Sequence, residues 1–252
     1  MIKIPTIAVV NSKGGVGKTT VCVHTGHALA LANKRTLIVD MDVQDNIRIW
    51  LDAEQKSVTL FEILVENQSI KDAIINVRTN LDIIPSGGDN IGAVPFLLSK
   101  SGKSIDVLRQ SLQLINNQYD YILIDCSPSR SLLHTIAIYA SDYVAIPVSM
   151  EWLSIVGSGQ VIKATQEVND KYNLKTEIKW IIPTFLDRRR SRICDDVLGS
   201  LKNAYGDNLT NPIRVNSKLS EAPGYGKTVF DMGDKRGIED FKNLAERMVA
   251  LG

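Results

Sequence analysis

Short apolar runs rich in β-branched residues alternate along the chain with longer segments whose apolar positions recur at the period of a helix. The runs predict β-strands at residues 6–11, 36–40, 81–85, 121–125, 143–148 and 178–183. Residues such as 122–124 are apolar at successive positions, so both faces of these strands should be buried, as in a parallel sheet. The alternation predicts one α/β domain over residues 1–252, a doubly wound, mostly parallel sheet with helices on both faces.

Composition places the chain among ordinary globular proteins. Apolar residues make up 44% and charged residues 23% of its 252 positions, which excludes a disordered, collagen-like or coiled-coil chain. The three cysteines, Cys22, Cys126 and Cys194, form no C-x-x-C pair, which favours a reduced, cytoplasmic setting. No apolar run approaches the roughly eighteen residues that span a bilayer, and no export signal is apparent. We expect a cytoplasmic protein.

The final segment, residues 238–251, has the pattern of an amphipathic helix. Phe241, Leu244, Ala245 and Met248 share one face, and charged residues of both signs occupy the other. A membrane-seeking helix concentrates Lys and Arg on its polar face, whereas here the charges balance. The segment therefore predicts a helix packed on the sheet, and no membrane partner.

The strongest chemical signal is the segment 11–20, Asn-Ser-Lys-Gly-Gly-Val-Gly-Lys-Thr-Thr, directly after the first predicted strand. Glycines in such a loop let backbone N–H groups point at phosphate oxygens, and the helix that follows adds its positive N-terminus. Lys18 is expected to balance the β and γ phosphates, and Thr19 to present its hydroxyl to Mg²⁺. The segment predicts a P-loop NTPase that binds its nucleotide through Lys13, Gly14, Gly15, Val16, Gly17, Lys18, Thr19 and Thr20.

The loop departs from the ordinary pattern at its start. Ser12 stands where glycine is usual, and an additional lysine, Lys13, follows it. The arrangement x-Lys-Gly-Gly-x-x-Lys-Thr resembles the deviant Walker A motif of the ParA/MinD family of ATPases. The resemblance implies an ATP-dependent homodimer in which Lys13 reaches the phosphates of the partner subunit, as an arginine finger does in trans. The alternative is that Lys13 is an ordinary solvated loop cation.

Two carboxylate sites stand where predicted strands end, the edge at which doubly wound sheets bind ligands. Asp125 resembles the Walker B aspartate, which implies that it holds magnesium through water. Residues 40–46, Asp-Met-Asp-Val-Gln-Asp-Asn, resemble the family motif Asp-x-Asp-Pro-Gln-Gly-Asn. The resemblance assigns to Asp42 the catalytic role of positioning or activating the attacking water, although Asp42 could instead cap a turn. Val43 and Asp45 replace the proline and glycine of the family motif.

Positive charge is concentrated late in the chain: residues 184–236 contain ten Lys or Arg and seven Asp or Glu. Four arginines fall in the basic stretch 188–192, and no aromatic residues are interleaved among them, so stacking on single strands is not expected. In the small Soj-like ParA proteins, which lack an N-terminal DNA-binding extension, the positions of Arg189 and Lys218 belong to a surface that binds DNA without sequence preference. The same resemblance places Pro212 and Arg214 against the adenine. The candidate DNA contacts are Arg188, Arg189, Arg190, Arg192, Lys218 and Lys227.

The alternative for this basic stretch is a solvated helix start paired with nearby aspartates. The resemblance as a whole predicts a partition ATPase, slow by itself, whose ATP-bound dimer binds double-stranded DNA on the nucleoid. A ParB-like adaptor would stimulate hydrolysis and release. Three other hypotheses stay open: a Min-like ATPase on a membrane, a ParA-like ATPase that positions a protein cargo, and a redox protein resembling the nitrogenase iron protein. A Rossmann dehydrogenase is discarded, because a lysine–threonine pair has no role on a dinucleotide.

Overall fold

A computed structural model of the chain describes residues 4–102, 104–128, 131–187, 189 and 191–250. A seven-stranded sheet lies at its centre, in the order β3-β4-β2-β5-β1-β6-β7. β3 runs antiparallel to β4, and all other neighbouring strands are parallel. The strands are β1 (Thr6–Val9), β2 (Thr36–Met41), β3 (Ile75–Arg78), β4 (Leu81–Ile84), β5 (Tyr121–Cys126), β6 (Tyr143–Ser149) and β7 (Glu177–Thr184).

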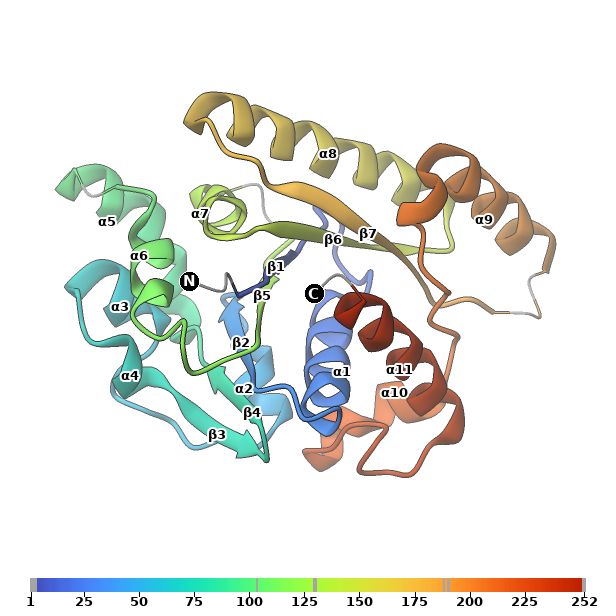
Figure 1. Cartoon of the computed structure of the whole chain (residues 1–252), viewed down its shortest axis with the longest axis horizontal. Coiled ribbons are helices and arrows are strands. Elements are labelled where there is room, and N and C mark those ends of the chain that lie inside the picture. The colour runs from blue at the N-terminus through green and yellow to red at the C-terminus, as the bar shows by residue number, and fades with distance from the viewer. Residues whose placement is uncertain (1–3, 103, 129–130, 188, 190, 251–252) are drawn as a thin grey trace.

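Helices connect the strands and cover both faces of the sheet (Figure 1). The α-helices are α1 (Lys18–Leu31), α2 (Asn46–Trp50), α3 (Leu60–Glu66), α4 (Ile70–Ala73), α5 (Val94–Ser101), α6 (Val107–Gln113), α7 (Leu132–Ala140), α8 (Trp152–Tyr172), α9 (Ser191–Tyr205), α10 (Ser217–Glu221) and α11 (Lys235–Val249). Short 3₁₀ helices are η1 (Gly88–Ala93), η3 (Gly206–Asn208) and η4 (Ala222–Tyr225).

Successive residues of the central strands enter two different hydrophobic clusters. Ala8 and Ile124 lie side by side on β1 and β5 and belong to the cluster that includes the buried side chains of α3 to α9. Their neighbours Ile7 and Leu123 point the other way and belong to the cluster that includes the buried side chains of α1, α2, α10 and α11. None of these four side chains is exposed to solvent. The predicted doubly wound fold is therefore confirmed, because both faces of the sheet are buried.

Each predicted strand is present, with bounds that differ by one or more residues. The edge strand β3 was not predicted, because its residues are half-exposed and form no continuous apolar run. The final helix begins at Lys235, earlier than predicted, since the Asp234 side chain accepts a hydrogen bond from the Gly237 N–H at 2.7 Å and caps it. No helix in the described part of the chain is long and apolar enough to cross a membrane.

The strand order brings the predicted chemistry to one edge of the sheet. In the register of the sheet, Asp125 at the end of β5 is the partner of Val9 on β1 and of Asp40 on β2. The glycine loop follows β1, and Asp42 follows β2. Because these three parallel strands are neighbours, their carboxyl ends place the glycine loop, Asp42 and Asp125 next to one another.

Candidate functional site

The glycine loop, residues 10–17, joins β1 to α1. Gly15 and Gly17 have φ angles of 71° and 89°, in the left-handed region that favours glycine. A Cβ atom added at Gly14 or Gly15 would meet no atom of the described residues within 4 Å, whereas one at Gly17 would lie 3.2 Å from the Phe185 ring. The backbone of the loop is therefore open to a ligand at residues 14 and 15. A hollow of about 430 Å³ adjoins it, lined among others by Lys13, Gly14, Gly15, Glu151 and Phe185.

Neighbouring strands hold the loop in place. The Thr184 hydroxyl at the end of β7 donates to the Val16 carbonyl at 2.8 Å. The Asn11 side chain donates to the Pro147 carbonyl of β6 at 2.7 Å and accepts from the Lys13 backbone N–H at 2.9 Å. These contacts fix the loop between β6 and β7, and Thr20, in the first turn of α1, is half-buried.

Lys18, Thr19 and Asp125 meet at the beginning of α1. The buried Lys18 ammonium donates to the Lys13 carbonyl at 3.2 Å. The Thr19 hydroxyl donates to Asp125 Oδ2 at 2.6 Å, and Asp125 Oδ1 is buried with no hydrogen-bond partner among the described residues. A hydroxyl next to a buried carboxylate with a spare oxygen suits a hydrated Mg²⁺ ion bridging to phosphates. The residues present therefore fit the predicted metal.

Burial sets the charges of this site. It lowers the pKa of Lys18, and the nearby Asp125 and Asp42 only partly offset this effect. Burial also raises the pKa of Asp125 to about 7; the Thr19 hydrogen bond and the Lys18 charge lower it, and the Asp42 charge raises it. These mutual influences place Asp42 within electrostatic reach of both residues. Lys18 thus compensates only part of the burial effect on Asp125, and a bound cation would further favour the charged carboxylate.

The two aspartates after β2 have different environments. Asp40 is fully buried and accepts the Asp42 and Ile47 backbone N–H groups at 2.9 and 3.0 Å, and burial raises its pKa well above the ordinary range. Asp42 is also buried, at 8% exposure, and its Oδ1 accepts the Gln44 N–H at 3.1 Å. Asp40 therefore shapes the turn, whereas Asp42 both caps the turn and interacts electrostatically with Lys18 and Asp125.

Asp45 occupies the motif position where the resembled family has glycine. Its φ angle is 49°, in the left-handed region, which explains why glycine suits this position. The Asp45 carboxylate accepts the Ser86 N–H at 3.1 Å and the Ser86 hydroxyl at 3.3 Å, and it pairs with Arg48. These contacts join the acidic segment to the end of β4 and offset the cost of the backbone conformation.

Asp45→Ala is therefore expected to lower the free energy of unfolding by about 2–3 kcal/mol, since it loses buried hydrogen bonds and keeps a strained backbone. Asp45→Gly should lose about 1 kcal/mol less, because glycine tolerates the positive φ. Urea denaturation of both variants measures the difference. Equal losses for the two would show that the backbone conformation is not strained.

Lys13 turns away from its own loop toward α8. Its ammonium donates to Glu151 Oε2 at 2.5 Å and to the Ser154 hydroxyl at 3.0 Å. The side chain thus lies at the mouth of the hollow, in contact with groups of its own subunit. The role of Lys13 on a partner's phosphates stays a prediction.

Arg214 lines a second hollow of about 650 Å³, which shares Asp187 and Val215 with the hollow beside the loop. The guanidinium is held by α11: Nε donates to Asp240 Oδ1 at 2.8 Å, and Nη2 donates to Glu239 Oε2 at 2.5 Å. These carboxylates raise the pKa of Arg214. Arg214 therefore lines a hollow that adjoins the one beside the loop, and Pro212, two residues before it, is half-buried. The adenine contact of both residues stays a prediction.

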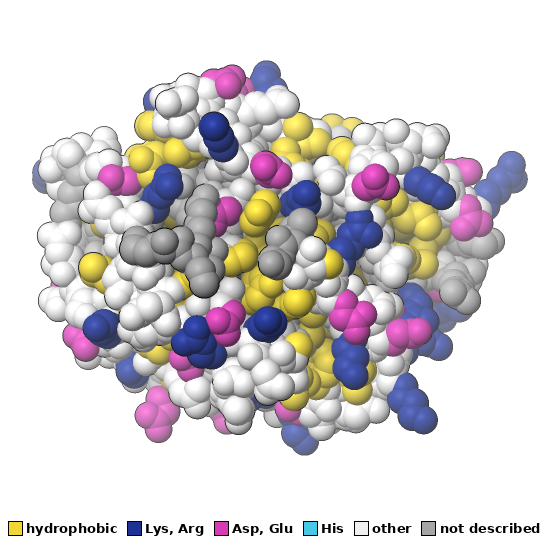
Figure 2. All heavy atoms as spheres, viewed as in Figure 1, with side chains coloured by type: hydrophobic (Ala, Val, Ile, Leu, Met, Phe, Trp, Pro, Cys, Tyr) yellow, Lys and Arg dark blue, Asp and Glu magenta, His cyan; other side chains and the backbone are white. Residues whose placement is uncertain are grey.

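The basic candidates are only partly described, since Arg188 and Arg190 lie outside the described residues. Arg189 is exposed but donates from Nε to Asp187 Oδ1 at 2.9 Å, and Lys218 donates to Glu221 at 2.7 Å. Arg192 and Lys227 are exposed. Figure 2 shows Lys and Arg interspersed with Asp and Glu over α9, α10 and α11. Nearby carboxylates thus offset part of the positive charge, as the alternative interpretation expected.

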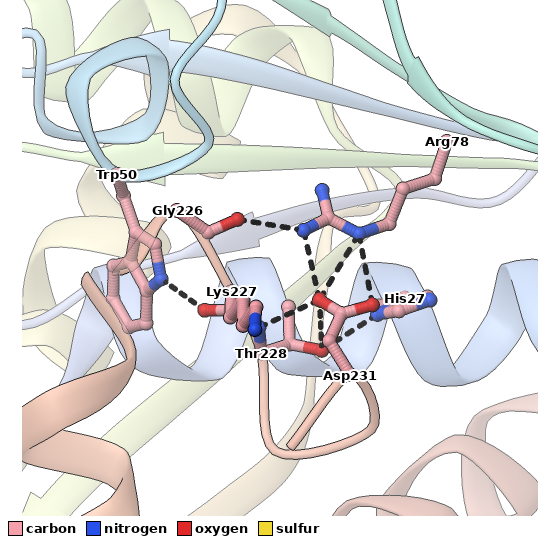
Figure 3. Close-up of polar contacts among 7 residues, drawn as sticks. All are labelled: His27, Trp50, Arg78, Gly226, Lys227, Thr228 and Asp231. Atoms are coloured by element: carbon pink, nitrogen blue, oxygen red, sulfur yellow. Dashed lines mark hydrogen bonds and ion pairs between the residues drawn. The ribbon is translucent and has the colours of Figure 1, made fainter. Parts of the chain in front are cut away.

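A separate polar cluster fixes the turn that carries Lys227 (Figure 3). The Trp50 indole at the end of α2 donates to the Lys227 carbonyl at 2.8 Å. Arg78 on β3 donates to Asp231 at 2.8 Å and to the Gly226 carbonyl at 2.9 Å. Asp231 in turn accepts the Thr228 N–H at 2.8 Å. The turn is thereby held to α2, which follows the acidic residues 40–46, and to the edge strand β3.

The glycine loop, the lysine at the start of α1 and the carboxylates at the sheet edge define a P-loop nucleotide-binding protein. A family model described as an AAA domain matches residues 4–178. Over the whole chain the protein is 36% identical to the sporulation initiation inhibitor protein Soj of Bacillus subtilis, covering 98% of each chain. The chromosome partitioning protein ParA of Caulobacter vibrioides is 33% identical, over 97% of this chain and 93% of the relative.

The chain therefore belongs to the Soj/ParA family of partition ATPases. A solved structure agrees with this assignment over the whole length. The putative plasmid partition protein of Borrelia burgdorferi, bound to AMPPNP, is 27% identical with a TM-score of 0.80, covering 99% of this chain and 100% of that one. The predicted family and fold class are confirmed.

Proposed function

We propose that this protein is a magnesium-dependent partition ATPase whose ATP-bound homodimer binds double-stranded DNA without sequence preference and releases it after hydrolysis. The observation that carries the proposal is the meeting of the Lys13-bearing loop, Lys18 and the Thr19–Asp125 pair at one edge of the sheet. The AMPPNP complex of the Borrelia relative supports ATP as the nucleotide. Chromosome and plasmid partition proteins among the relatives favour DNA as the cargo.

In the proposed mechanism, the loop amides and the Lys18 ammonium bind the β and γ phosphates. Thr19 and Asp125 would hold Mg²⁺, which when bound neutralises phosphate charge. Asp42 orients the attacking water and accepts a proton late in the reaction. Lys13 from the second subunit completes the charge balance. Turnover is slow until a ParB-like adaptor stimulates it, and the dimer stays on the nucleoid until then.

A membrane partner has less support. The apolar face of α11 is buried, with Phe241 fully enclosed and Leu244 and Met248 nearly so. This face packs along α1 in the same hydrophobic cluster. A helix cannot insert its apolar side into lipid while that side is part of the core. The Min-like alternative would therefore need α11 to detach.

The proposal is tested by measuring DNA binding with ATP, with ADP and without nucleotide across a range of salt, alongside the molecular mass. We expect a doubled mass and DNA binding only with ATP. If the dimer neutralises about six phosphates, log K should fall with log salt at a slope of about −5. Equal DNA binding in the three nucleotide states would contradict the proposal.

The double variant Arg189→Glu and Lys218→Glu should lose DNA binding by at least about tenfold while keeping the ATP-dependent mass, because both residues are solvent-exposed. Lys163→Glu, at another solvent-exposed position, on α8, is the control and should bind DNA as the original protein does. Loss of both DNA binding and the dimer in the double variant would indicate interface damage instead.

A further inference from the structure

We infer that the Glu151 carboxylate holds Lys13 within its own subunit and thereby opposes ATP-dependent dimerisation until the contact breaks. Glu151 is a positioning residue for Lys13. The inference rests on the proposed function, in which Lys13 acts on the phosphates of the partner. It adds a competitor for that lysine, supplied by the same chain.

Among the described residues, the Lys13 ammonium has two hydrogen-bond partners. Glu151 Oε2 lies 2.5 Å away and the Ser154 hydroxyl 3.0 Å away. Ser154 is itself held by the Ser149 hydroxyl at 2.6 Å, at the end of β6. Ser149 ends β6, Glu151 lies in the connection, and Ser154 is in the first turn of α8. Together they form a binding site for the Lys13 ammonium.

Binding of the Lys13 ammonium at this site depends on the charge of Glu151. Glu151 is the residue at the N-cap of α8, a helix of 21 residues, and its side chain makes no cap hydrogen bond. The N-terminus of a helix carries partial positive charge, which repels an ammonium group. Without the carboxylate, Lys13 would face this positive end with only the Ser154 hydroxyl to hold it.

The backbone around Lys13 is also fitted to α8. A Cβ atom added at Gly157 would lie 3.1 Å from Asn11 Oδ1 and 3.9 Å from Lys13 Cβ. Glycine at this position therefore lets the loop approach the helix closely. The Ser12 hydroxyl makes a further contact with Gln160 Oε1 at 3.3 Å. The loop thus contacts α8 through Ser12, and the partly exposed Lys13–Glu151 pair adds a further contact beside it.

The Lys13–Glu151 ion pair is exposed enough that phosphates could displace the Glu151 carboxylate from Lys13. The Lys13 side chain is 32% exposed and that of Glu151 is 61% exposed, so water and salt screen their attraction. Both residues line the hollow beside the loop, where a bound triphosphate would add negative charge. In the dimer, the phosphates of the nucleotide bound to the second subunit would compete with Glu151 for the Lys13 ammonium group.

The test is Glu151→Gln, which keeps the size of the side chain and removes its charge. With ATP present, we expect half-dimerisation at about three- to tenfold lower protein concentration than for the original protein, because two such exposed pairs break per dimer. Sedimentation at low and high salt measures this, and high salt should narrow the difference. The matched control is Glu167→Gln on the same helix, whose carboxylate pairs with the exposed Lys163 at 3.9 Å.

Ser154→Ala is a second variant that removes the other partner of Lys13 and should shift the midpoint in the same direction by a smaller factor. An unchanged or weaker dimer in Glu151→Gln, with ATP binding retained, would overturn the inference and leave the proposed function standing. Failure of the original protein to dimerise with ATP would instead overturn the proposed function, and the inference with it.

Discussion

Replacing Lys18 with alanine is expected to weaken ATP binding by at least about 100-fold, because a buried charge that pairs with phosphate contributes several kcal/mol. Lys18 is the first residue of α1 and is nearly enclosed. The measurement is the ATP-induced rise in melting temperature, which reports affinity through ligand linkage. The variant should show no rise at ATP concentrations that stabilise the original protein.

The same variant is not expected to unfold. Burial lowers the pKa of Lys18, so the protein without ligand gains little from this charge, and its loss should leave the melting temperature without ATP nearly unchanged. Lys163→Ala, at an exposed position, is the control and should respond to ATP normally. An ordinary response to ATP in Lys18→Ala would mean that the loop does not hold the triphosphate.

The parallel strands were predictable because each is buried on both faces and therefore apolar at successive positions. β3 was not, since Ile75–Arg78 lies at the edge of the sheet, pairs antiparallel with β4 and is half-exposed. Its role becomes visible only in three dimensions, where Arg78 holds Asp231 from the C-terminal region (Figure 3). Hydrophobic patterning reports burial, and an edge strand with one partner has little of it.

The site divides in a similar way. The loop residues 13–20 are contiguous, so their spacing alone specified the turn and the helix start. The contact of Lys13 with Glu151 was not predicted, because Glu151 lies 138 residues away in the sequence. The strand order offers the signal that was available: Glu151 follows β6, next to β1 in the sheet, so its position at the carboxyl edge follows from the topology.

The acidic segment shows where a sequence resemblance needs geometry. Asp40 and Asp42 are both aspartates of one motif, and Asp40 is the register partner of Asp125. Yet the Asp40 oxygens accept the Asp42 and Ile47 N–H groups, which occupies Asp40 in the turn. The Asp42 side chain, by contrast, makes one described hydrogen bond in the turn and interacts electrostatically with both Lys18 and Asp125. The structure thus favours Asp42 over Asp40 for a role on water.

Asp42→Ala is accordingly expected to keep ATP binding and dimerisation and to lower hydrolysis by at least about 100-fold, the range lost when a positioned base is removed. The cost to folding should be about 1 kcal/mol, since the Asp42 side chain makes one described turn hydrogen bond, to the Gln44 N–H. Single-turnover hydrolysis and DNA retention after ATP addition measure the effect.

Asp42→Asn provides the matched control, because an amide oxygen can still accept the Gln44 N–H but cannot take a proton. Both variants should remain on DNA long after the original protein has dissociated, and the asparagine variant should fold with nearly the original stability. Release of Asp42→Asn at the original rate would contradict the assignment. Asp42 would then serve the turn alone, and the residue that activates water would have to be sought elsewhere at this edge of the sheet.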